Sequence, residues 1–199
     1  YGYFKGLKLD PHAAWGKLDY PSMLLGTYEK EVIDTIHNKS YIHQKILVEL
    51  GAADGFYAIG ALFNKRFTQA HCFEMTENGR NTIARNAELN GVSNQISIHG
   101  HADSGFYTNL PQLNWDNVFI LCDVEGAEFE IFSDESLKAV SGATIVIEIH
   151  HWVKDFWIKY EKLIKIANQY FTINTFARNH MNFPDCPELY DMHDDNRAL

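Results

Sequence analysis

Three absences narrow the classes of protein to which this 199-residue sequence can belong. No apolar run reaches the roughly 18 residues that a membrane-spanning helix needs, so we expect no membrane partner. The N-terminal segment YGYFKGLKLD lacks the apolar stretch of a signal peptide, which predicts a cytoplasmic protein. Basic side chains are few, with 17 Lys and Arg against 26 Asp and Glu and a net charge of −9. Because nucleic acids bind basic patches, this balance predicts that nucleic acid is not a partner.

Cysteine is also scarce. The three cysteines are Cys72, Cys122 and Cys186, and no two of them have the CxxC spacing of a metal or redox motif. Cys72 and Cys122 lie in apolar, strand-like runs. We therefore expect buried free thiols in a reducing compartment, not a disulfide framework.

The sequence has no repeat, low-complexity segment or linker, which predicts one domain over residues 1–199. Residues 1–40 are expected to form a helical or cap segment. Residues 41–177 are expected to form an α/β core that binds a cofactor, followed by a polar tail over 178–199. The oligomeric state stays open, with a homo-oligomer among the alternatives.

Strand-like and helix-like stretches alternate through the middle of the chain. Continuously apolar runs predict strands at 45–50, 69–75, 95–101, 118–124, 143–150 and 170–177. Helices are predicted at 27–37, at 55–65, at 77–89 and from 152 onward. This alternation predicts a Rossmann-like α/β fold, with a central, mostly parallel sheet of about seven strands and helices on both faces.

Polar residues follow each predicted strand, at the sheet edge where parallel α/β proteins bind ligands. Gly51 and Gly55 follow the first strand and allow a tight turn into a helix, whose N-terminus offers free N–H groups. Glu74 lies 23 residues beyond Gly51, where a carboxylate can accept both hydroxyls of a ribose. After the third strand, Asp103 could accept the amino group of an adenine.

The fourth and fifth strands are followed by groups that can move a proton. Asp123, Glu125, His150 and His151 are the candidate catalytic residues. We predict that no metal is bound. The alternative, in which Asp123, Glu148 and a histidine hold a divalent ion, stays open because carboxylates and imidazole are metal ligands.

Four segments resemble the FkbM-type methyltransferases, which belong to class I. These are VELGAADGFYA (48–58), FEMTENGRNTIARNAELNGV (73–92), LCDVEGAEFEIF (121–132) and IVIEIHHW (145–152). The resemblance covers roughly residues 26–152. Members use S-adenosyl-L-methionine (SAM) as cofactor and are O-methyltransferases that often act on sugars or natural products. For this chain the resemblance therefore implies SAM and a small-molecule acceptor with a hydroxyl group.

The resemblance also implies a role for each matching position. The methionine part of SAM would be lined by Glu49, Gly51, Ala53 and Gly55. Glu74 would hold the ribose, and Met75 and Asp103 would flank the adenine. Asp123 would lie near the methyl group. The chain departs from the family where such sequences often read D-x-G-A-N-x-G. Glu49 replaces the first Asp, and Asp54 replaces the Asn.

Two other functions remain as alternatives. A nicotinamide-dependent oxidoreductase would need G-x-G-x-x-G, but the three glycine positions hold Gly51, Ala53 and Phe56. A module that binds a cofactor without turnover is the second alternative, because a fold alone does not imply a reaction.

Overall fold

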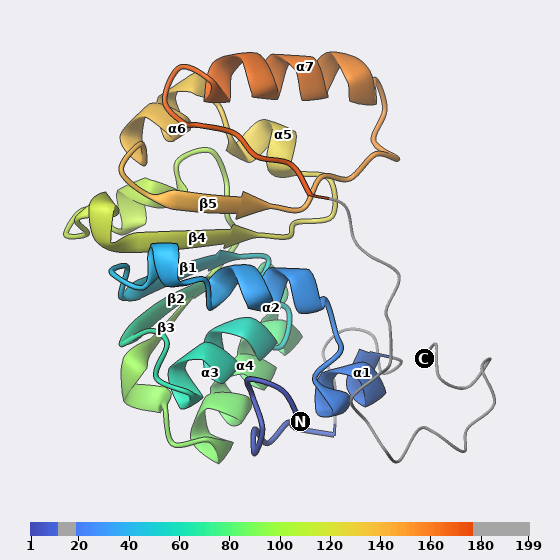
Figure 1. Cartoon of the computed structure of the whole chain (residues 1–199), viewed down its shortest axis with the longest axis vertical. Coiled ribbons are helices and arrows are strands. Elements are labelled where there is room, and N and C mark those ends of the chain that lie inside the picture. The colour runs from blue at the N-terminus through green and yellow to red at the C-terminus, as the bar shows by residue number, and fades with distance from the viewer. Residues whose placement is uncertain (12–18, 177–199) are drawn as a thin grey trace.

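The computed structural model describes residues 1–11 and 19–176, so the predicted tail and Cys186 lie outside the described residues. Five parallel strands form one sheet in the order β3-β2-β1-β4-β5 (Figure 1). The strands are β1 (Ile46–Leu50), β2 (Gln69–Phe73), β3 (Ile96–His99), β4 (Val118–Cys122) and β5 (Thr144–Ile147). The predicted Rossmann-like fold is thus confirmed, with five strands in the described residues instead of about seven. The strand order changes direction between β1 and β4, which is where ligands bind in such sheets.

Helices cover both faces of the sheet, as the apolar strands require. One core contains Leu47 of β1 and Leu121 of β4, packed under α2 (Lys30–Ile36), α3 (Phe56–Phe63) and α4 (Glu77–Leu89). The second core contains Val48 and residues of α5 (Glu128–Ile131), α6 (Asp134–Ala139) and α7 (Phe156–Ala167). The remaining short elements are α1 (Tyr20–Leu25), η2 (Lys39–Tyr41), η3 (Ser93–Gln95), η4 (Phe106–Asn109) and η5 (Trp115–Asn117).

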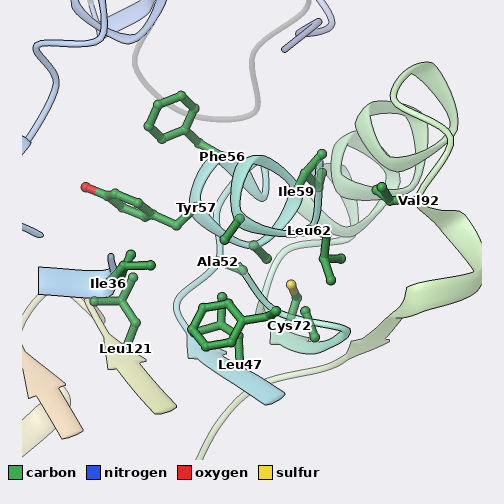
Figure 2. Packing of buried hydrophobic residues seen from close by; sticks show 14 of the residues in the cluster. Ile36, Leu47, Ala52, Phe56, Tyr57, Ile59, Leu62, Cys72, Val92 and Leu121 are labelled. Atoms are coloured by element: carbon green, nitrogen blue, oxygen red, sulfur yellow. The ribbon is translucent and has the colours of Figure 1, made fainter. Parts of the chain in front are cut away.

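Helix α3 lies at the centre of the first core. Figure 2 shows Phe56, Ile59 and Leu62 projecting from α3, with Leu47 and Cys72 on the strand side of the helix. The N-terminal segment packs on the opposite side, where a Cβ at Gly60 would lie 2.5 Å from the Phe4 ring. Nearly every side chain of α3 is therefore buried. Cys72 and Cys122 are free and buried, as predicted.

Local signals set the bounds of α4. The Thr76 hydroxyl accepts a hydrogen bond from the Gly79 N–H at 3.0 Å, which caps the first turn. Asn90 is the C-cap, and Gly91 follows in the left-handed region with a φ of 69°. The helix covers Glu77–Leu89, the bounds that the sequence predicts.

The buried Arg66 was not singled out from the sequence. Its guanidinium donates to the carbonyl oxygens of Ile36, Tyr41 and Gln44, at 2.6, 2.8 and 2.7 Å. All three acceptors lie on the connection from α2 to β1. Arg66 thereby fixes the N-terminal helices against the sheet.

The predicted strand over 170–177 is wrong for residues 171–176, which form no strand. Position 177 lies outside the described residues. Tyr170 and Phe171 pack against the second core, and the Tyr170 hydroxyl donates to Asp134 Oδ1 at 2.9 Å. The apolar pattern thus reflects packing against α6 and α7. Among the residues described, no helix combines the length and the apolar composition needed to cross a membrane.

Candidate functional site

The glycine turn after β1 brings two strand ends into contact. Gly51 has a φ of +83°, and a Cβ there would lie 1.7 Å from the carbonyl oxygen of Asp123, at the end of β4. Gly55, with a φ of +79°, is the N-cap of α3. Between them, Ala53 has a φ of 49°. The sequence therefore needs glycine at position 51 to close the sheet edge at its switch point.

Glu74 ties the end of β2 to this turn. Its Oε2 accepts a hydrogen bond from the Ala53 N–H at 3.0 Å, and its Oε1 accepts from the N–H and the hydroxyl of Thr76, both at 2.7 Å. The carboxylate is buried. It thus holds the turn and the start of α4 together at the predicted cofactor site. Its contact with a ribose stays a prediction.

The two residues predicted to contact the adenine, Met75 and Asp103, follow the neighbouring strands β2 and β3. Met75 is largely exposed directly after β2. Asp103 is exposed beyond β3, and its Oδ1 accepts a hydrogen bond from the Gly105 N–H at 2.8 Å. This bond closes a local turn of the kind that aspartate commonly forms. The roles of both residues toward adenine stay predictions.

Glu49 lies under α3, inside the first core. Its Oε2 accepts a hydrogen bond from the Ala58 N–H at 3.1 Å and lies 3.7 Å from the Cys72 sulfur. Burial, reinforced by the nearby charge of Asp54, raises the pKa of Glu49 to about 8. The carboxyl group is therefore protonated in the folded protein near neutral pH. Its predicted contact with the methionine part of SAM is untested.

This pKa predicts a stability change with pH. Glu49 has an ordinary pKa of 4.5 and a folded-state pKa of about 8, so between these values the folded protein holds one more proton than the unfolded chain. The free energy of unfolding should fall as pH rises through this window, by up to about 1.4 kcal/mol per pH unit. We expect Glu49→Gln to make this fall shallower, leaving the part that comes from other raised carboxyl groups such as Asp123. Glutamine keeps an acceptor for the Ala58 N–H. Urea unfolding at several pH values measures it, and equal slopes for both proteins would contradict it.

The ends of β4 and β5 bring three predicted groups together. Ligand atoms of Asp123, Glu148 and His150 all lie within 4.8 Å of one another. We call these three residues the acid–histidine cluster. His150 is 2% exposed, and its Nε2 lies 3.3 Å from Asp123 Oδ1. Asp123 follows β4 directly, while Glu148 and His150 share one side of the segment after β5. The cluster therefore lies beside Gly51, at the strand switch point.

Glu128 fixes the orientation of His150. Its Oε1 accepts a hydrogen bond from the His150 N–H at 2.8 Å and lies 3.2 Å from Nδ1. Glu128 is wholly buried at the start of α5. The sequence shows it as one of three acids after β4 but assigns it no role. With Nδ1 directed at Glu128, the other ring nitrogen of His150, Nε2, faces Asp123.

The two other candidate catalytic residues lie further out. His151 is exposed, while Glu125 is about half exposed and its Oε2 lies 3.8 Å from His150 Nε2. Of the two adjacent histidines, the structure brings only His150 into the cluster. Glu125 stays at its rim.

Glu29, on the N-terminal side of α2, was missed as a candidate. The Tyr57 hydroxyl donates a hydrogen bond to Glu29 Oε2. Burial raises the pKa of Asp123 to about 7, and the charges of Glu148 and Glu29 add to this rise. In the sequence, Glu29 was marked only by its place in the helix predicted over 27–37. The site is thus strongly acidic and partly shielded from water.

A cavity of about 890 Å³ opens on the β5 side of the cluster. Asp123, Glu148, Glu29 and Tyr57 line it, together with apolar side chains of β5 and α7. The cavity lies away from Glu74 and Met75. Its walls thus combine a polar end with apolar sides, as binding sites for small organic molecules do.

No protein-family model matches the chain, and no curated protein matches its sequence. Solved structures are similar in fold. A ribosomal protein L11 methylase from Lactobacillus delbrueckii subsp. bulgaricus has a TM-score of 0.47 and 13% identity, over 82% of this chain and 74% of that chain. A SAM-dependent methyltransferase from Geobacter sulfurreducens in complex with S-adenosyl-L-homocysteine has a TM-score of 0.42 and 12% identity, over 60% of this chain and 46% of that chain. A tRNA methyltransferase from B. subtilis has a TM-score of 0.45 and 13% identity, over 67% of this chain and 53% of that chain.

Identities this low concern the fold alone. The chain has a Rossmann-like α/β fold, as its parallel strand order shows. It spans about half the length of most of these structures. None of them singles out the FkbM type.

The prediction that nucleic acid is not a partner is wrong, because tRNA methyltransferases are among the similar structures. The inference failed because net charge sums over the whole surface. Contact with RNA needs only a local basic groove, which an overall charge of −9 does not exclude.

Proposed function

We propose that the chain is a SAM-dependent methyltransferase that methylates a hydroxyl oxygen. The observation that carries this proposal is the position of the acid–histidine cluster. It adjoins the Gly51 turn at the strand switch point, with His150 held by Glu128. A nucleotide cofactor and a proton-accepting centre would then meet at one edge of the sheet.

SAM would lie over the carboxyl ends of β1, β2 and β3. The turn from Gly51 to Gly55 would receive the methionine part at the N-terminus of α3. Glu74 would accept the ribose hydroxyls, with Met75 and Asp103 near the adenine. Asp123 would then lie near the methyl group, because its carbonyl oxygen adjoins Gly51.

The reaction is an in-line displacement at the methyl carbon. The acceptor oxygen forms a bond to this carbon while the carbon–sulfur bond breaks, and S-adenosylhomocysteine leaves. The acceptor proton passes to the acidic groups around Asp123. Most of the rate gain would come from holding the acceptor about 3–3.5 Å from the methyl group.

The resemblance to FkbM-type enzymes favours a small molecule as acceptor, such as a sugar or natural product. The apolar walls of the cavity support an organic ring in this place. Because similar structures include tRNA methyltransferases, RNA belongs in the acceptor screen as a second class. Methyl transfer from labelled SAM to fractions of each class would identify the acceptor.

Thermal unfolding tests the cofactor. A ligand at 100 times its Kd adds about 2.7 kcal/mol to the free energy of unfolding. For a chain of this size, we expect SAM or S-adenosylhomocysteine to raise Tm by roughly 5–11 °C. Glu74→Gln should lose most of this shift, whereas Glu77→Gln, at the start of α4, should keep it. A shift with NAD alone would contradict the proposal.

A further inference from the structure

The acid–histidine cluster has the composition of a metal site. Asp123 and Glu148 offer carboxylate oxygens, and His150 offers an imidazole nitrogen. Carboxylates suit Mg²⁺, Ca²⁺ and Mn²⁺, while imidazole favours transition metals, so the mixed set favours an ion such as Mn²⁺. Ligand atoms about 2.1 Å from one ion lie within about 4.2 Å of one another. The ligand atoms of the three residues now lie within 4.8 Å of one another, which is close to this spacing. Only a small movement of the side chains would therefore be needed to bind an ion.

Asp123 supplies a second observation that points to a cation. Its side chain is one-third exposed, but its Oδ1 atom is buried and has no hydrogen-bond partner among the described residues. This oxygen lies 3.3 Å from His150 Nε2. A buried acceptor without a donor costs about 1–3 kcal/mol, so such atoms in proteins usually face a ligand, an ion or water.

The hydrogen bonds of His150 explain why a cation fits there. If Nδ1 donates to Glu128, a neutral imidazole carries its lone pair on Nε2, facing Asp123 Oδ1. Two lone pairs at this distance repel each other unless a proton or a metal ion lies between them. A carboxylate that accepts from the outer nitrogen is the usual support of a metal-bound histidine. Glu128 is in this position and is wholly buried.

We propose that Asp123, Glu148 and His150 bind one divalent cation of the Mn²⁺ type. Asp123 and Glu148 line the cavity, so the ion would be reachable by a molecule bound there. The binding site follows from these residues alone. Its part in catalysis rests on the proposed function.

With the ion bound, the roles within the cluster change. Asp123, Glu148 and His150 would hold the ion, which would act as a Lewis acid toward an acceptor hydroxyl. Glu125 at the rim would then take the hydroxyl proton as the oxygen bonds to the methyl carbon and the carbon–sulfur bond breaks. The proposal takes up the alternative that the sequence left open, in which Asp123, Glu148 and a histidine hold a divalent ion, while the prediction of no metal stays untested.

Mn²⁺ binding to the full chain tests the site without any methyl transfer. The protein is treated with chelator and desalted, and free Mn²⁺ is followed by electron paramagnetic resonance during titration. We expect one Mn²⁺ per chain. Glu148→Gln should weaken binding at least about tenfold, and Glu128→Gln, which alters only the support of His150, about 10–100-fold. Glu130→Gln on α5 is the matched control and should bind like the unchanged protein.

Two results would overturn the site: no Mn²⁺ uptake at millimolar concentration, or equal uptake by the unchanged protein and Glu148→Gln. Circular dichroism of each variant confirms that a loss of binding is not a loss of folding. SAM binding measured in excess EDTA separates this inference from the proposed function. Tight SAM binding without Mn²⁺ uptake would reject the metal alone, and the reverse would reject the cofactor alone.

Discussion

Gly51→Ala should destabilise the protein more than any other single methyl addition to the site. The added Cβ would lie 1.7 Å from the Asp123 carbonyl oxygen, so the ends of β1 and β4 would have to separate. A left-handed backbone costs a residue with a side chain about 1–3 kcal/mol, and overpacking costs a further 1–3 kcal/mol. We therefore expect the free energy of unfolding to fall by about 2–6 kcal/mol, measured by urea unfolding.

Gly91→Ala is the matched control for this change. Gly91 also has a positive φ, of +69°, but a Cβ there would meet nothing within 4 Å. Only the backbone cost applies, so the expected loss is about 1–3 kcal/mol, without the further cost of overpacking. Similar losses for the two variants would show that the strand ends do not meet at Gly51.

His150→Gln should give the largest loss of activity. His150 joins Glu128 to Asp123 and is the only histidine of the adjacent pair in the cluster. Removing a group that moves a proton, or that holds an activating ion, lowers kcat by about 10²–10⁴-fold. Binding of SAM should change little, because Glu74 and the Gly51 turn are untouched. Initial rates of methyl transfer and titration with SAM measure the two effects.

His151→Gln separates the two histidines that the sequence left equal. His151 is exposed and lies outside the cluster, so its loss should cost far less than the loss of His150. Equal losses for both variants would mean that the chain around β5 rearranges when the acceptor binds. A larger loss for His151→Gln would refute the assignment of His150.

The sequence by itself determined the elements whose causes are local. Thr76 and Gly91 bound α4, because a cap acts through its own neighbouring N–H groups. The apolar runs predict β1 and β4, because strands buried on both faces need no polar side. The sequence also predicted that the acids after the strands lie near one another, because the carboxyl ends of parallel strands all lie at one edge of the sheet.

Only the tertiary structure decided which of these acids meet. Glu29 reaches the site from the N-cap of α2, and no pattern in the sequence links it to Asp123. Glu128 stands in the same acidic run as Asp123, but only the fold shows that it contacts His150. The same holds for His150 over His151, because the contacts of His150 with Glu128 and Asp123 show which of the two rings is buried in the site. Residues 171–176 also read as a strand, but Phe171 packs against the helices of the second core and Phe176 is exposed. An apolar pattern in the sequence indicates that a side chain is buried, but the tertiary fold decides which neighbours it packs against.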